Sequence, residues 1–140
     1  MGPEVALALD DREAIKQLKA RYFRLMDTKQ WDDMRTLFTD DVAVDTTASG
    51  GPVFDNADAF VAFLRETLGE AVTVHQGHMP EIEITSPTTA TGIWALNDTI
   101  IFTGGVRMTG FGHYHETYVK VADGWRIASS TLTRLHMDLA

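Results

Sequence analysis

The second half of this chain consists of long segments in which apolar and polar residues alternate. From Val72 onward, four runs are rich in Thr, Val, Ile, Tyr and Trp: TVHQGHMPEIEIT, TATGIWALNDTIIF, RMTGFGHYHETYVKV and WRIASSTLTRLHMDL. Such residues in a two-residue alternation are typical of half-buried strands. The runs are separated by Ser86-Pro87, Gly104-Gly105 and Asp123-Gly124, and the last of these is a strong hairpin signal. The pattern predicts a long antiparallel meander.

The first half of the chain has the three- and four-residue apolar spacing that is typical of helices. We expect the first helix to begin at a cap formed by Asp10 or Asp11, and two further helices to precede the meander. Residues 1–9 are expected to form a flexible arm, followed by a single domain at residues 10–140. Helices followed by an antiparallel meander indicate the α+β class.

A long, strongly curled sheet wrapped around three N-terminal helices would form a cone. We therefore expect an α+β barrel with a curled antiparallel or mixed sheet. The inside of such a cone does not have to fill completely, and it is a natural place for an apolar pocket with a few polar groups.

Composition excludes several classes of function. The net charge is -8, which argues against a surface that binds nucleic acid, because such a surface needs basic residues to neutralise phosphates. The chain has no cysteine, so a disulfide scaffold, a thiolate zinc site and a cysteine nucleophile are excluded. No secretory signal or membrane-spanning segment is expected, and a cytoplasmic location is the default.

Two acidic residues occupy unusual positions. Asp27 falls in the last turn of the first predicted helix, at the end that is unfavourable for a carboxylate. Asp98 interrupts the apolar strand ALNDTIIF and shares a face with Trp94 and Leu96. A buried carboxylate is costly unless it is paired, so Asp98 either has a partner such as a histidine or faces outward into a subunit contact.

The histidines do not form an obvious metal site. His75 and His78 fall on opposite faces of their strand, so they make a poor metal pair. His113 and His115 share a face opposite Glu116, and because Glu116 and the other charge on its face indicate a solvent-facing surface, we expect both histidines to point into the cone. Polar lining of a pocket is favoured over metal binding for them.

Three segments together resemble a known family. RYFRLMDTKQWDDMRTLFTDDVAV, GHYHETYVKV and DGWRI resemble the SnoaL-like branch of the nuclear-transport-factor-two-like superfamily, over about residues 11 to 135. The same fold carries dehydratases, isomerases, polyketide cyclases and non-catalytic binders, so the fold alone does not fix the function.

The resemblance implies roles for several residues. Asp27 and His75 match the Asp–His pair of hexachlorocyclohexane dehydrochlorinase, in which the histidine is the base and the aspartate orients it; scytalone dehydratase uses a similar pair. Tyr22 and Asp98 match positions of a bile-acid dehydratase and could bond a developing enolate oxygen or a leaving hydroxyl, Asp98 in its protonated form. The candidate catalytic residues are thus His75, Asp27, Tyr22 and Asp98.

The expected activity is a cofactor-independent lyase of the dehydratase type that acts on a hydrophobic small molecule. The alternatives are an isomerase or polyketide cyclase of the ketosteroid-isomerase type, and a non-catalytic binding module or hydroxylase-associated subunit. The candidate substrate-binding residues are Trp94, Leu96, His113, His115 and Arg134. We expect no metal or cofactor, and we expect a homodimer to which Tyr114, Tyr118 and Trp125 contribute.

Overall fold

The computed structural model describes residues 2–140 and contains three α-helices, a short 3-10 helix and one six-stranded mixed sheet. In chain order the elements are α1 (Pro3–Asp27), α2 (Trp31–Arg35), β1 (Phe38–Asp45), η1 (Thr47–Ser49), β2 (Val53–Phe54), α3 (Ala57–Leu68), β3 (Val72–Ser86), β4 (Thr89–Ile101), β5 (Arg107–Val121) and β6 (Gly124–Leu139).

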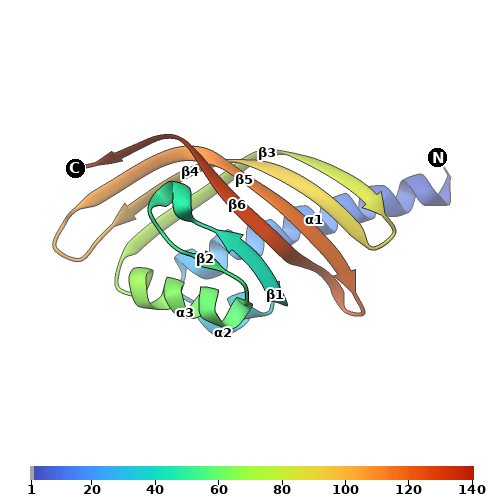
Figure 1. The fold of residues 1–140 in the computed structure, drawn as a ribbon. Helices are drawn as coiled ribbons and strands as arrows, with labels where there is room; N and C mark the ends of the chain where they lie inside the picture. The colour runs from blue at the N-terminus through green and yellow to red at the C-terminus, as the bar shows by residue number, and fades with distance from the viewer. Residues whose placement is uncertain (1) are drawn as a thin grey trace.

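The sheet curls around the helices, which lie on its concave side (Figure 1). The strand order is β2-β1-β6-β5-β4-β3; β1 pairs with β6 in parallel, and the other pairs are antiparallel. The expected α+β cone is confirmed. The sheet does not close into a full barrel, because β2 and β3 remain as its two edges.

Strand β3 deviates where the sequence contains Pro80. The β3–β4 register shifts between His78 and Glu81, and Met79 has a φ of 39°. Proline has no backbone N–H to donate to a neighbouring strand, so in sheets it is confined to edge strands and bulges. Pro80 lies at a bulge in an edge strand. The predicted hairpin at Asp123-Gly124 joins β5 to β6, and Gly124 has a φ of 128°.

Helix α1 begins earlier than the sequence analysis expected. It starts at Pro3, so residues 3–9 are helical and do not form a loose arm, and the helix is not capped by Asp10 or Asp11. Proline is favoured in the first turn of a helix, and the alanines and leucines that follow are strong helix formers. Asp11 is instead buried and accepts hydrogen bonds from Lys120 and Trp125.

The inner face of β5 is the opposite of the one expected. Tyr114, Glu116 and Tyr118 are buried on the concave side, whereas His113 is half-buried and His115 is exposed on the convex side. The prediction that the two histidines point into the cone is therefore wrong. It failed because it treated Glu116 as a mark of the solvent side, but this carboxylate has a buried partner.

That partner is Lys19 of α1, whose ammonium lies 2.8 Å from the Glu116 carboxylate. The reversal also changes the expected subunit contact, because Tyr114, Tyr118 and Trp125 are all buried within a single chain and cannot form it. The homodimer itself stays a prediction. No helix within residues 2–140 is both long enough and apolar enough to cross a membrane.

Candidate active site

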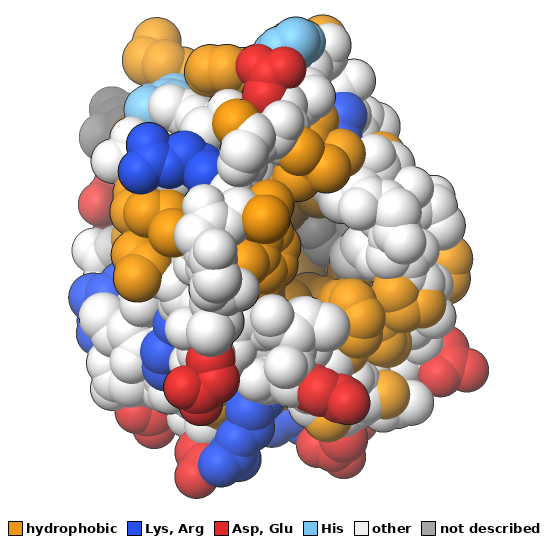
Figure 2. Space-filling view, turned by 90° about the vertical axis from the view of Figure 1, so that its left-hand side faces the viewer, with side chains coloured by type: hydrophobic (Ala, Val, Ile, Leu, Met, Phe, Trp, Pro, Cys, Tyr) orange, Lys and Arg blue, Asp and Glu red, His pale blue; other side chains and the backbone are white. Residues whose placement is uncertain are grey.

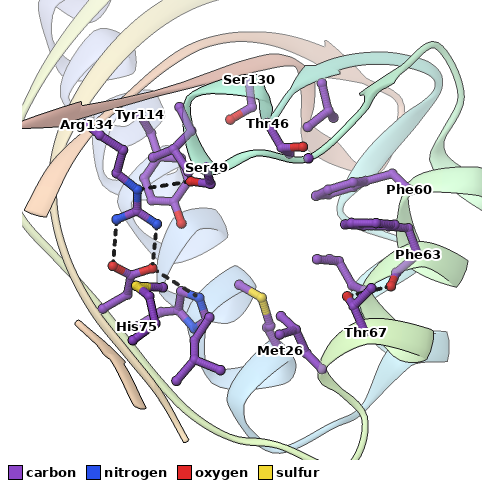
Figure 3. Close-up of a pocket in the computed structure, with 18 of the residues that line it drawn as sticks. Met26, Thr46, Ser49, Phe60, Phe63, Thr67, His75, Tyr114, Ser130 and Arg134 are labelled. Carbon is purple, nitrogen blue, oxygen red and sulfur yellow. Dashed lines mark hydrogen bonds and ion pairs between the residues drawn. The ribbon is translucent and has the colours of Figure 1, made fainter. Parts of the chain in front are cut away.

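A cavity of about 320 Å³ lies between the concave face of the sheet and helices α1 and α3. Figure 2 shows it as a hollow bordered by hydrophobic side chains, on the side of the molecule that is at the left of Figure 1. Most of its wall is apolar, formed by Met26, Val44, Phe60, Phe63, Leu64, Leu68, Ile100, Phe102, Met108, Leu132, Met137 and Leu139. Its ionisable side chains include Asp45, His75, Asp98 and Arg134. Figure 3 shows His75 and Arg134 on one side of the cavity and Thr67 on the other.

Asp27 and His75 lie within hydrogen-bond distance of each other. The Nδ1 atom of His75 is 2.7 Å from Oδ1 of Asp27, and the backbone N–H of His75 donates to Oδ2 over 2.7 Å. The hydroxyl of Thr73 also donates to Asp27, and it accepts a hydrogen bond from Lys29. This arrangement is possible because α1 ends at Asp27. The chain then turns away from the helix axis at Lys29, whose φ is 61°.

The carboxylate of Asp27 therefore lies behind the imidazole and fixes its orientation. With Nδ1 donating to Asp27, Nε2 of His75 has the free lone pair, and the ring lines the cavity. Nε2 lies 4.0 Å from Oδ2 of Asp98, which is too far for a hydrogen bond but close enough to stabilise a proton on that nitrogen.

The carboxylate of Asp98 forms an ion pair with the guanidinium of Arg134. The two Nη atoms of Arg134 donate to the two oxygens of Asp98 over 2.7 and 2.9 Å, and Nε donates to the hydroxyl of Ser49 over 3.0 Å. A bidentate guanidinium–carboxylate pair is strong and geometrically specific. Because both Asp98 oxygens accept from Arg134, the expected role of Asp98 as a protonated donor does not fit this geometry.

A glycine makes room for this pair. Gly110 of β5 lies opposite Asp98 in the sheet, and a Cβ atom at this position would contact both Oδ1 of Asp98 and Nη1 of Arg134. The Ser49 contact in turn ties the segment between β1 and β2 to β6, so this loop forms part of the cavity wall.

Two tyrosines complete the polar region. Tyr22 of α1 and Tyr114 of β5 line the cavity, with ring centroids 5.9 Å apart. Burial raises the pKa of Tyr22 and of Tyr114, and the nearby carboxylates Asp98 and Glu116 add to both shifts. Both phenols therefore remain protonated at neutral pH and can donate hydrogen bonds.

The other expected site residues have different positions. Trp94 and Leu96 point inward as predicted, but they are buried in the core and do not line the cavity; the indole of Trp94 donates to Tyr118. His113 and His115 lie on the convex face, away from the cavity. Arg134 is at the cavity, where it contacts Asp98.

Sequence reasoning missed Tyr114, Ser49 and the aromatic wall formed by Phe60 and Phe63. Tyr114 shares its face of β5 with Glu116 and Tyr118, and it was missed because alternation alone does not show that this face is the inner one. Ser49 had no signal, since its contact with Arg134 spans 85 residues. Within residues 2–140, no three His, Cys, Asp or Glu side chains are arranged to hold a metal ion.

Comparisons with known proteins agree with this architecture. The profile of the SnoaL-like domain family matches residues 7–131. A probable cyclase, FGR4, from Gibberella zeae is 29% identical, over 96% of this chain and 98% of the relative. The Kfla4162 protein from Kribbella flavida is 28% identical, with a TM-score of 0.84 over 94% of this chain and 95% of that one.

A third similarity concerns the fold alone. The structure of hexachlorocyclohexane dehydrochlorinase LinA-type3 from Novosphingobium barchaimii LL02 is 15% identical, with a TM-score of 0.83 over 96% of this chain and 93% of that one. The family profile spans most of the chain, from within α1 to the middle of β6. This chain therefore belongs to the SnoaL-like domain family.

Proposed function

We propose that this protein is a lyase that eliminates water from a hydrophobic small molecule, with His75 as the base. The observation that carries the proposal is the position of His75. Its Nδ1 atom is bonded to Asp27 at 2.7 Å, and its Nε2 atom lies at the wall of an apolar cavity. A base needs a fixed tautomer, a free lone pair and access to the substrate, and these contacts of His75 support all three.

The first step in the proposed reaction is proton abstraction. Nε2 of His75 takes a proton from a carbon next to a carbonyl group, and the electron pair of the C–H bond moves into an enolate. The resulting imidazolium lies between two carboxylates, with Asp27 at 2.7 Å from Nδ1 and Asp98 at 4.0 Å from Nε2. Both charges favour the protonated ring, as a buried carboxylate does in a catalytic triad.

The second step is departure of the hydroxyl group. The enolate collapses to a carbon–carbon double bond, the bond to the leaving oxygen breaks, and the imidazolium returns its proton so that water leaves. A protonated tyrosine at the cavity wall is suited to hold the enolate oxygen between these steps, and Tyr22 of α1 lines the cavity. All groups in this sequence belong to the chain itself.

The charges in the cavity favour a neutral substrate. Asp98 and Arg134 neutralise each other, Asp45 adds a carboxylate to the wall, and most of the remaining wall is apolar. Among the lining residues within 2–140, the guanidinium of Arg134 already gives each of its nitrogens to Asp98 or Ser49, so the proposed substrate carries no fixed negative charge before His75 takes its proton. A ring system with a carbonyl and a hydroxyl group fits these surroundings best.

A second candidate function is isomerisation or cyclisation. It is favoured by the similarity to the probable cyclase of Gibberella zeae, which extends over nearly the whole length of both chains. The same base and the same enolate would serve, and only the fate of the enolate would differ. The product distinguishes the two functions, because elimination loses water whereas isomerisation and cyclisation of the same skeleton do not.

Two related probes test the proposal. 3-Hydroxy-1-tetralone can lose water to give 1-naphthol, which absorbance detects. 1-Tetralone has the same acidic carbon but no leaving group, so deuterium uptake from heavy water measures proton abstraction alone. We expect the parent protein to accelerate both reactions, and His75→Ala to lower both rates by roughly 10²–10⁴-fold. Exchange without elimination would favour the isomerase or cyclase.

Asp27→Asn should act through the same base and lower both rates by roughly 10²-fold or more. The matched control is His78→Ala, which removes an exposed histidine from the same strand. This variant should keep the activity of the parent protein. Exchange that is equally fast in the parent protein and in His75→Ala would disprove the role of His75.

A further inference from the structure

Lys19 is the most unusual residue outside the proposed Asp–His pair. It belongs to α1, and its side chain is completely buried. Its ammonium lies 3.7 Å from the ring centroid of Tyr22 and 3.7 Å from that of Tyr114, over both rings. A lysine is rarely buried without a partner, and the energy of a cation over an aromatic face is largest when water is excluded.

The partner of Lys19 is surrounded by hydrogen-bond donors. Glu116 accepts hydrogen bonds from the Lys19 ammonium over 2.8 Å, from Ser130 over 2.8 Å and from the Tyr118 hydroxyl over 2.7 Å. A carboxylate this close favours the ammonium form of Lys19. Burial lowers the pKa of Lys19, and Glu116 opposes that shift.

The two tyrosines connect this buried pair to the cavity. Tyr22 and Tyr114 both line the cavity, while their ring faces contact the ammonium behind them. Ser130 also lines the cavity and donates to Glu116. The buried pair therefore contacts the cavity wall at both ends: Tyr22 and Tyr114 contact its cation, and Ser130 contacts its carboxylate.

We propose that Tyr22 and Tyr114 together bind an oxyanion in the cavity, and that Lys19 is the positioning residue that orients their rings and strengthens them as donors. The proposal deepens the proposed function, since the oxyanion would be the enolate of that reaction. A cation over the face of a phenol draws electron density from the ring, so the hydroxyl becomes a stronger hydrogen-bond donor.

The surrounding charges explain why a cation is needed there. Burial raises the pKa of Tyr22, and the carboxylates Glu116, Asp27 and Asp98 each raise it further. The same carboxylates disfavour negative charge on an oxyanion that these hydroxyls would hold. Lys19 is the cation directly over the two rings, so it opposes this repulsion at the shortest distance.

Binding of two small phenols tests the proposal without any turnover. 4-Nitrophenol is partly ionised near neutral pH and its phenolate absorbs visible light, whereas 4-methylphenol stays neutral. The decisive variant is the double substitution Lys19→Met with Glu116→Gln, which removes both charges and leaves no unpaired ion. The matched control is Lys120→Met, which breaks the Lys120–Asp11 pair, 3.1 Å long and remote from the cavity.

We expect the parent protein to bind 4-nitrophenolate more tightly than 4-methylphenol. The double variant should lose roughly tenfold in phenolate affinity, with a change of less than about threefold for 4-methylphenol. Lys120→Met should match the parent protein with both probes. If the double variant does not fold, Tyr114→Phe tests the oxyanion site itself, because it keeps Lys19 and removes one hydroxyl; a roughly tenfold loss is expected again.

Equal phenolate affinity in the parent protein and in the double variant would overturn the role of Lys19. A parent protein that does not prefer the phenolate would overturn the oxyanion site altogether. Neither result depends on the proposed elimination, because the phenols do not react. Conversely, loss of deuterium exchange in His75→Ala with phenolate binding intact would separate the base from the oxyanion site.

Discussion

Two buried ion pairs within residues 2–140, Lys19–Glu116 and Asp98–Arg134, lie in different settings. Lys19–Glu116 is sealed in the core, where both side chains have 0% exposure. Asp98–Arg134 lies at the cavity wall, where the two side chains are 3% and 10% exposed. Both pairs are short, at 2.8 and 2.7 Å, so the length of the contact does not distinguish them. The difference lies in what each pair can reach.

The sealed pair is satisfied entirely by protein groups. Ser130 and Tyr118 donate to Glu116, and two aromatic rings cover Lys19. In the proposed oxyanion site, this pair would act on a ligand through Tyr22 and Tyr114. The cavity pair borders the space that a ligand would occupy and lies beside His75. Loss of one partner should therefore be costlier in the sealed pair, where water cannot replace it.

The largest effect on stability is expected for Glu116→Ala. This substitution leaves the Lys19 ammonium buried and without its carboxylate, and removal of one partner from a buried pair costs about 3–5 kcal/mol. Urea denaturation of the parent protein and the variant measures the difference in the free energy of unfolding. A loss below about 1 kcal/mol would mean that Lys19 finds water or another partner.

The double substitution Lys19→Met with Glu116→Gln is the control for this prediction. It removes both charges together, and replacing a whole buried pair by neutral groups is often close to neutral for stability. We expect the double variant to unfold near the urea concentration of the parent protein. If it were as unstable as Glu116→Ala, the volume of the side chains and not the stranded charge would explain the loss.

A smaller loss is expected for Arg134→Met. Asp98 then loses both hydrogen bonds from the guanidinium, but its carboxylate borders the cavity, where water can solvate it. We expect a loss of about 1–3 kcal/mol in urea denaturation, the usual cost of an unsatisfied polar group. A loss as large as that of Glu116→Ala would show that the two pairs are equally closed to water.

Gly110→Ala tests the same pair without removing a charge. The new Cβ atom would contact Asp98 and Arg134, and the flexible arginine would have to move. We expect a loss at the lower end of the same range, about 1 kcal/mol, because the displaced guanidinium remains close to the carboxylate. A stability equal to that of the parent protein would mean that the pair tolerates the displacement.

Alternation along single strands predicted much of the fold and part of the site. Alternation placed Asp98 on the same face as Trp94 and Leu96, and all three are buried in the structure. The strand alone left open whether this face was the inner one. The meander and the β5–β6 hairpin followed from local residues too. Asp27 and His75 were brought together by their resemblance to a family pattern, and not by any local signal.

The failures at the site share one physical cause, which is pairing over long sequence distances. The Lys19–Glu116 contact spans 97 residues, and Asp98–Arg134 spans 36. Alternation divides the residues of β5 between two faces but does not show which face is the inner one, so that choice depended on whether Glu116 was paired. Because Glu116 has a buried partner on another element, its face is the inner one, and the expected positions of His113 and Tyr114 are exchanged.

The smallest effects are expected on the convex face of β5. His115 is exposed and its Nε2 atom is 3.1 Å from the hydroxyl of Thr133, while His113 is half-buried beside it. Substituting an exposed residue away from special features changes stability by less than about 0.5 kcal/mol. His113→Ala and His115→Ala should therefore change neither urea denaturation nor the binding of 4-nitrophenolate. A loss of phenolate binding in either variant would place these histidines in the cavity after all, and the face assigned to β5 would be wrong.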